Sequence, residues 1–231
     1  MPSAMKRSIP ILALALLLIC ALAAPALADA PLSTVKEGVD KVIAVLQDPQ
    51  YKGAKSISGK QLEQLRTVIK QYFDFTELTA RAVGRPWLKF SPQQQKDLSG
   101  AFQELLEKTY IGKFEGYNGE KFDYQKEMAQ GNLAFVQSQV TANDGKVLAV
   151  NFRLIQKDGR WLIYDVIGEG ISIMEIYRSQ FAQEVQNGSP DSLIGKVRQR
   201  VADIAAGKAV ADDKAVLNDA AKQQQPTAAK Q

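Results

Sequence analysis

The sequence contains no histidine. This absence excludes Ser-His-Asp and Cys-His catalysis, histidine-ligated metal sites and acid–base catalysis by imidazole. The sequence also lacks a GxGxxG or GxxxxGK[ST] motif, so nothing in it supports the usual phosphate-binding loops. Carboxylates are the catalytic groups that remain, and we expect neither a metal site nor a cofactor.

The N-terminus has the composition of a targeting segment. Lys6 and Arg7 precede an apolar run over 11–22, and Ala26-Leu27-Ala28 places small residues at the positions that define a cleavage site. The run is shorter than the roughly 20 apolar residues of a transmembrane helix. We therefore expect residues 1–28 to be a secretory signal peptide that is cleaved after Ala28.

The chain has a single cysteine, Cys20, which would leave with the signal peptide. An exported chain without cysteine has no disulfide framework, which favours a bacterial envelope protein with an ordinary core over a small extracellular module. A lipoprotein acylated at Cys20 is the alternative. Ile19 argues against it, because acylation signals have a small residue at that position.

The remaining chain is long enough for one domain and carries little net charge. Removal of Lys6 and Arg7 leaves 27 basic against 25 acidic residues, scattered along the sequence, so we expect no nucleic-acid partner. We predict a single domain over 29–207. Residues 208–231 are rich in Ala, Lys, Asp and Gln and lack aromatics, which predicts a poorly ordered tail.

Apolar residues at helical spacing predict several helices. Ser91 followed by Pro92 and Gln94 predicts a capped start for the longest of them, whose apolar stripe is also the most aromatic. The other predicted helices begin near Thr34, Leu62, Phe75, Ser172 and Ser189.

From Lys121 onward the hydrophobic period changes to two, which predicts strands. Asn143-Asp144-Gly145 and Asp158-Gly159 are turn sequences that join the run 147–155 to its neighbours. We predict an α+β fold in which an antiparallel meander of about four strands packs against the helices.

The run from Arg160 is apolar on both faces and is predicted to be a central strand. Alternation places one set of its side chains on one face and a second set on the other, namely Trp161, Ile163 and Ile167 against Leu162, Tyr164 and Val166.

Two features have both a structural and a functional interpretation. Asp165 and Glu169, at the end of the predicted central strand, are the available catalytic carboxylates. We favour the structural interpretation, in which Asp165 accepts a hydrogen bond from the backbone and Glu169 is solvated in the turn. The aromatic residues match a plain core as well as a binding surface. The residue patterns alone therefore describe an exported α+β domain without recognisable catalytic groups.

The order and spacing of several short segments resemble the MlaC family of periplasmic phospholipid-binding proteins, also known as toluene-tolerance auxiliary proteins. The resemblance covers Val35 to Ala205 and leaves the tail outside. It rests on Phe73-Asp74-Phe75, Gly84 with Trp87, the helix from Ser91 to Tyr110, the segment from Tyr164-Asp165-Val166 through Glu169-Gly170-Ile171-Ser172, and Tyr177-Arg178-Ser179-Gln180-Phe181.

The resemblance implies a non-enzymatic periplasmic carrier of phospholipid. Such a carrier would move lipid between an outer-membrane lipoprotein–porin complex and an inner-membrane ABC transporter complex of the Mla type, maintaining outer-membrane lipid asymmetry. Two alternatives stay open: a carboxylate-based envelope hydrolase that uses Asp165 and Glu169, and an interaction module without a ligand.

A carrier of this kind must enclose the acyl chains of its ligand. Two chains of about 16 carbons hold about 30 methylenes, and at roughly 0.8 kcal/mol each their exposure to water costs on the order of 25 kcal/mol. We expect an apolar cavity between the sheet and the helix from Ser91, with Tyr110 and Tyr164 nearer its mouth. The expected lining residues are Trp87, Phe102, Leu105, Leu106, Tyr110, Phe114, Val150, Phe152, Tyr164, Val166 and Ile171.

Overall fold

The computed structural model of the chain describes residues 30–54, 56–115 and 117–208. The expected signal peptide, and the expected tail apart from its first residue, lie outside the described residues. Within the described ranges, no helix is long and apolar enough to cross a membrane.

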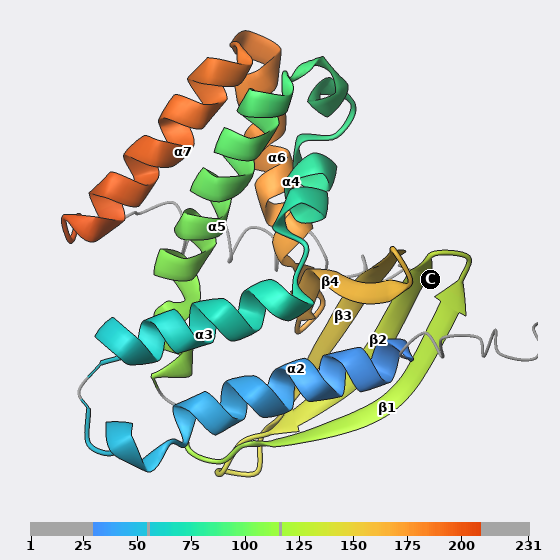
Figure 1. The fold of residues 1–231 in the computed structure, drawn as a ribbon, viewed down its shortest axis with the longest axis vertical. Coiled ribbons are helices and arrows are strands. Elements are labelled where there is room, and N and C mark those ends of the chain that lie inside the picture. The colour runs from blue at the N-terminus through green and yellow to red at the C-terminus, as the bar shows by residue number, and fades with distance from the viewer. Residues whose placement is uncertain (1–29, 55, 116, 209–231) are drawn as a thin grey trace, which may run out of the picture.

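The described chain folds into helices and one sheet (Figure 1). The α-helices are α2 (Pro31–Leu46), α3 (Gly59–Tyr72), α4 (Phe75–Val83), α5 (Pro92–Phe114), α6 (Ile173–Asn187) and α7 (Pro190–Ala205). The 3-10 turns are η2 (Pro49–Tyr51) and η3 (Arg85–Lys89), and the strands are β1 (Lys121–Gln130), β2 (Leu133–Thr141), β3 (Val147–Lys157), β4 (Arg160–Gly168) and β5 (Ile171–Ser172).

The sheet is the predicted antiparallel meander, with strand order β1-β2-β3-β4-β5. Four strands are long, and β5 has only two residues. The β3–β4 turn is the predicted Asp158-Gly159 pair, with φ values of 50° and 77°. Both residues are thus left-handed, as a tight two-residue hairpin turn requires.

The predicted central strand, β4, is an inner strand of the sheet along only part of its length. It lies between β3 and the short β5, which pairs only with Ile167 and Gly168. The first part of β4 is therefore next to the sheet edge. That edge is covered by the start of α4, where Phe73 bridges Ile163 and the N–H of Asp74 donates to the Ile163 carbonyl at 2.7 Å. The strand is apolar on both faces because α2 covers one face and α4 and α6 cover the other.

A β-bulge changes the facing of side chains along β4. Arg153 pairs with Asp165 while Leu154 pairs with Ile163, so Tyr164 is an extra residue without an opposite partner. After the bulge, Val166 returns to the face that carries Ile163, whereas simple alternation predicted opposite faces. Val166 consequently packs with Ile163 in one apolar cluster, whereas Tyr164 packs in another.

A side-chain cap starts α4, α5, α6 and α7, whereas α2 and α3 have none. The Ser91 hydroxyl accepts from the Gln94 N–H at 3.2 Å and the Gln94 side chain accepts from the Ser91 N–H at 3.0 Å, so the predicted capping box is confirmed. Helix α2 begins at Pro31 and not at Thr34. The first turn there is stabilised from the sheet, because Glu127 of β1 accepts from the N–H of Leu32 at 2.8 Å.

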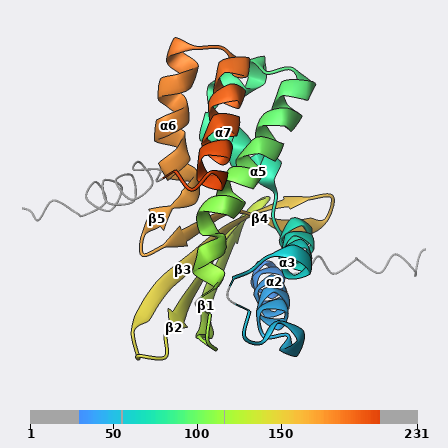
Figure 2. The ribbon, with the colours of Figure 1, turned by 90° about the vertical axis from the view of Figure 1, so that its left-hand side faces the viewer.

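The described residues form two apolar cores. The helices α4 to α7 and the sheet with α2, which enclose them, occupy different parts of the fold (Figures 1 and 2). The helical core lies among α4, α5, α6 and α7, with Leu98, Phe102 and Tyr177 at its centre. The sheet core lies between α2 and one face of the sheet, with Val35 and Leu154 fully buried. We call this face of the sheet the inner face.

Candidate functional site

The inner face of the sheet is well covered at one end and poorly covered at the other. Val136, Phe152 and Val166 form one cross-strand row, and Val136 and Phe152 in it are buried beneath α2. Toward the β2–β3 turn the next apolar row is Phe122, Val140 and Leu148, and all three side chains are only half-buried. The protein covers one end of this apolar face and leaves the other partly open.

The helices around that poorly covered end are also apolar and also half-buried. The second half of α2, one side of α3 and the last turns of α5 all contribute such residues. We call the residues concerned the half-buried apolar set: Val42, Ile43, Val45, Leu46, Leu62, Ile69, Tyr110, Ile111, Phe114, Phe122, Val140, Leu148 and Val150. Apolar side chains from several elements that converge without burying one another are typical of a ligand site.

Hydrogen bonds connect the elements at this end of the molecule. The Glu115 carboxylate, just after α5, accepts from the N–H of Ile57 in the α2–α3 loop at 3.2 Å. The Asn143 side chain of the β2–β3 turn donates to the Asn118 carbonyl at 2.8 Å. Through these polar contacts the end of α5 is held to the α2–α3 loop, and the segment after α5 is held to the β2–β3 turn.

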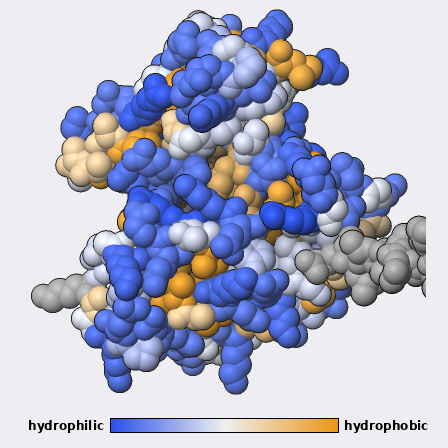
Figure 3. Space-filling view, viewed as in Figure 1, coloured by the Kyte–Doolittle hydropathy of each residue, from blue (hydrophilic) through white to orange (hydrophobic). Residues whose placement is uncertain are grey.

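The space-filling view shows the same arrangement from outside (Figure 3). The face seen there is hollowed between the α5–α7 pair and α3, and apolar surface lies within the hollow. The surrounding rim is mostly hydrophilic. The hollow between α3 and the α5–α7 pair therefore combines an apolar interior with a polar border.

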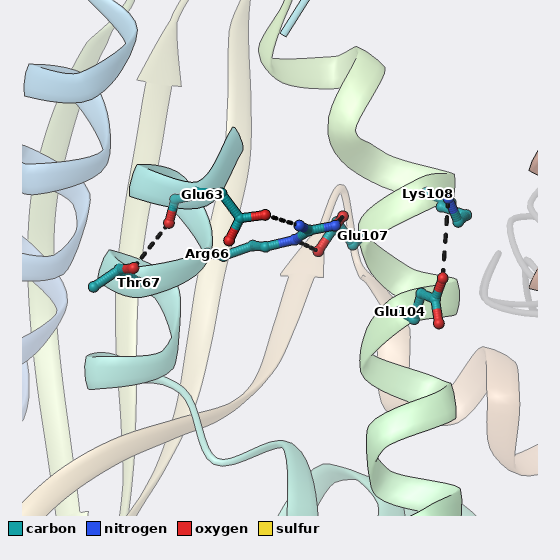
Figure 4. Close-up of polar contacts among 6 residues, drawn as sticks. All are labelled: Glu63, Arg66, Thr67, Glu104, Glu107 and Lys108. Carbon is teal, nitrogen blue, oxygen red and sulfur yellow. Dashed lines mark hydrogen bonds and ion pairs between the residues drawn. The ribbon is translucent and has the colours of Figure 1, made fainter. Parts of the chain in front are cut away.

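An ion pair crosses from α3 to α5 beside the half-buried apolar set (Figure 4). Nε of Arg66 donates to Oε2 of Glu107 at 2.6 Å, Nη2 donates to Oε1 of the same carboxylate, and Nη1 pairs with Glu63. The Arg66 and Glu107 side chains are 32% and 16% exposed. The bonds to Glu107 raise the pKa of Arg66, so this charge is permanent.

The structure divides the predicted lining residues between the two cores. Phe102, Leu105, Leu106 and Tyr164 are buried in the helical core, and Trp87, Tyr110 and Ile171 pack at its border. Phe152, Val150 and Val166 belong to the sheet core. Phe114 is half-buried and lies in neither core.

The long helix does not cover the sheet as we expected. Helix α5 packs chiefly on α7 and α4, whereas α2 lies along β1, β2 and β4. Within the helical core, the Phe102 ring contacts the rings of Tyr177 and Phe181 at centroid distances of 4.7 and 5.0 Å. The buried half of α5 thus serves the helical core, and only its last turns reach the half-buried apolar set.

Sequence reasoning missed several members of the half-buried apolar set as site residues. The apolar stripe of α2 and the alternation that includes Leu148 were both visible in the sequence. Nothing in the sequence showed that α2, and not α5, is the helix opposite the sheet, because that depends on contacts across about a hundred residues such as Leu32 with Glu127.

The two candidate catalytic carboxylates both bind the backbone. Asp165 is fully buried and accepts from the Met174 N–H at 3.0 Å, the Ser172 hydroxyl at 2.7 Å and Arg153 at 3.0 Å. Burial raises its pKa despite these donors. Glu169 is exposed and accepts from the Ala149 N–H at 2.6 Å. The expected backbone bond of Asp165 is confirmed, and Glu169 closes the end of the β3–β4 ladder.

One polar group on the inner face is unpaired. The hydroxyl of Tyr124 is buried and has no hydrogen-bond partner in the described part of the chain. Burial strongly raises the pKa of this phenol, so it stays protonated and can donate. In the same described ranges, no group of three or more acidic, histidine or cysteine side chains is arranged to hold a metal ion.

The chain is similar in sequence to known proteins. The family model described as MlaC protein matches residues 36–199. The chain is 22% identical over 178 residues to the intermembrane phospholipid transport system binding protein MlaC of Haemophilus influenzae, covering 73% of this chain and 81% of that protein. It is 31% identical over 104 residues to the toluene tolerance protein ttg2D of Pseudomonas putida, covering 45% of this chain and 48% of that protein.

A solved structure has the same fold. The phospholipid-binding protein of Ralstonia solanacearum, determined in complex with a phospholipid, superposes with a TM-score of 0.69 at 28% sequence identity. The alignment covers 77% of this chain and 99% of that protein.

Proposed function

This chain belongs to the MlaC family, and on that basis we propose that it is a periplasmic phospholipid carrier. It holds the acyl chains of its ligand against the inner face of the sheet, between α2, α3 and the last turns of α5. The headgroup stays at the polar border of the site, where it remains hydrated.

The observation that carries this proposal is the half-buried apolar set. Its members come from α2, α3, α5 and the first three strands, and every one of them is left half-buried. Acyl chains placed there would bury both these side chains and their own methylenes, which cost on the order of 25 kcal/mol to expose for two chains of about 16 carbons. The structural relative from Ralstonia solanacearum, which was solved with a phospholipid, supports the same ligand class.

The predicted lining residues take two roles in this proposal. Tyr110, Phe114, Val150, Phe152 and Val166 contact the acyl chains. Four residues buried in the helical core and two at its border form the rigid support behind the site: Phe102, Leu105, Leu106 and Tyr164, with Trp87 and Ile171. The unpaired hydroxyl of Tyr124 is a suitable donor for an ester carbonyl of the lipid.

The carrier exchanges lipid with two membrane complexes in turn: an outer-membrane lipoprotein–porin complex and an inner-membrane ABC transporter complex of the Mla type. This exchange maintains outer-membrane lipid asymmetry. The printed name of the Haemophilus influenzae relative, an intermembrane transport system binding protein, supports such a role. Docking to both in turn requires weak and partly electrostatic contacts, which agrees with scattered surface charges.

Direct extraction tests this proposal. Protein purified from the bacterial envelope should yield near-stoichiometric phospholipid in an organic extract, quantified by mass spectrometry. A lipid-free extract, together with no uptake from vesicles, would support the ligand-free interaction module. Release of fatty acid from labelled phospholipid would support the hydrolase, for which the engaged carboxylates of Asp165 and Glu169 offer no free base.

A further inference from the structure

Charged side chains connect α3 to α5 at the side of the proposed lipid site. Helix α3 packs on α2, and α5 packs on α7 and α4. Arg66 reaches across to Glu107 through two parallel hydrogen bonds (Figure 4). Glu115 makes a second contact to this side at Ile57. The connection between the two helices is thus made by ends of long side chains.

Apolar residues lie immediately beside this ion pair. Leu62 and Ile69 share a helix face with Arg66, at i−4 and i+3, and Tyr110 and Ile111 share a face with Glu107, at i+3 and i+4. All four are half-buried members of the apolar set. Separation of Arg66 from Glu107 would therefore expose apolar side chains on both helices.

The ion pair is suited to reversible opening. Its side chains are partly exposed, so water replaces each lost hydrogen bond when the pair separates. Glu63 retains Arg66 on its own helix, so the guanidinium keeps a carboxylate partner after Glu107 is released. If α3 and α5 were joined by a close apolar contact instead, water could not replace the lost contact when the helices separated. The bidentate geometry still defines one closed position.

We propose that the space between α3 and α5 is the passage through which acyl chains enter and leave the site, and that the Arg66–Glu107 ion pair closes it. This inference rests on the proposed function. The pair is a positioning element: it contacts no part of the bound acyl chains and acts by holding two helices together.

Reversible cross-linking through introduced cysteines tests the passage. The only cysteine is Cys20, within the expected signal peptide, so the mature protein has no competing thiol. The double variant Arg66→Cys, Glu107→Cys is joined with a short bismaleimide that contains a cleavable disulfide. The matched control is Glu184→Cys, Lys196→Cys, which replaces an ion pair between α6 and α7.

The readout is the transfer of a fluorescent phospholipid between protein and vesicles of equal parts phosphatidylethanolamine and phosphatidylglycerol. Cross-linking at 66 and 107 should slow both uptake and release at least tenfold, and cleavage of the linker should restore them. Cross-linking at 184 and 196 should change neither rate. Unchanged rates in a fully cross-linked 66–107 protein would overturn the passage while leaving the carrier function intact. Absence of uptake before cross-linking, in wild type as well, would instead overturn the proposed function.

Single variants provide a second test that does not depend on the linker. Arg66→Gln and Glu107→Gln should each speed uptake and release several-fold. The rates of Arg66→Lys should lie between those of these variants and wild type, because lysine keeps the charge and loses only the bidentate contact. Salt should speed exchange in wild type by screening the pair and should have little effect in Arg66→Gln. Equal salt dependence in both proteins would contradict the inference.

Discussion

The carboxylate of Asp165 accepts a hydrogen bond from the backbone N–H of Met174 at 3.0 Å, which attaches the first turn of α6 to β4 inside the protein. Asp165→Asn puts an amide donor in place of an oxygen that accepts from Arg153 and Ser172. We expect a loss of about 1 to 3 kcal/mol in the free energy of unfolding, with unchanged lipid content. Denaturant unfolding and lipid extraction measure the two effects. Loss of lipid from a folded variant would support the hydrolase alternative.

The same variant gives a pH test. Burial raises the pKa of Asp165 above its ordinary value of 3.8, so the folded protein binds this proton more tightly than the unfolded chain does. Wild type should therefore gain stability relative to Asp165→Asn as the pH falls from neutral toward 3.8. Denaturant unfolding of both proteins across this range measures the difference in their free energy of unfolding. A difference that does not change with pH would show that burial does not dominate the pKa of Asp165.

Two tryptophan substitutions distinguish the proposed lipid site from the helical core. Val150 is half-buried on the inner face, so Val150→Trp should keep the fold and displace bound phospholipid. Leu106 is buried in the helical core, so Leu106→Trp should cost about 1 to 3 kcal/mol through overpacking. Thermal unfolding and lipid extraction are measured on both. The placement of the site is wrong if Val150→Trp is stable and retains full lipid.

Tyr124→Phe tests the unpaired hydroxyl on the inner face. Removal of a buried polar group without a partner should stabilise the lipid-free protein by about 1 kcal/mol. Tyr51→Phe is the control, because its hydroxyl donates to Gln64 at 2.8 Å and its loss should destabilise. If the Tyr124 hydroxyl binds a lipid ester, the same substitution should weaken phospholipid binding. Equal destabilisation by both substitutions would mean that the Tyr124 hydroxyl is paired in solution.

A pair of glycines tests the packing of α2 on α3. A Cβ at Gly38 would lie 3.0 Å from Cγ of Tyr72, whereas a Cβ at Gly100 in α5 would meet nothing within 4 Å. Alanine at Gly100 should therefore raise stability by up to about 1 kcal/mol through helix propensity. Alanine at Gly38 should lower stability, because Tyr72 must move away from its contact with Lys41. Thermal unfolding compares the two alanine variants. Equal stabilisation by both would contradict the close approach of Gly38 to Tyr72.

The parts of the fold that the sequence predicted are those that depend on neighbouring residues. The capping box at Ser91 and the turn at Asp158-Gly159 are each specified within a few positions. The place of β4 in the sheet and the side chain direction after Tyr164 depend on pairing with β3 and on the bridge to Phe73. Period-two alternation contains no information about an inserted residue, so it assigned Val166 to the wrong face.

The site was predicted less completely than the fold for a related reason. Apolar periodicity identifies which side chains turn inward, and it did so for the stripe of α2 and for Val150. It does not indicate whether an inward side chain will be fully covered. That difference separates Leu106 in the helical core from Val150 on the inner face, and it is set by how far apart the finished elements lie.

Two neighbouring residues of β4 link the unfolding of the two cores. Ile163 and Tyr164 are adjacent in the chain, yet one packs in the sheet core and the other in the helical core. A peptide unit shared in this way cannot leave one core without disturbing the other, so the two cores should melt in a single cooperative transition. We therefore expect the protein to behave thermodynamically as one unit, so that whatever stabilises the sheet core also raises the melting temperature of the helical core.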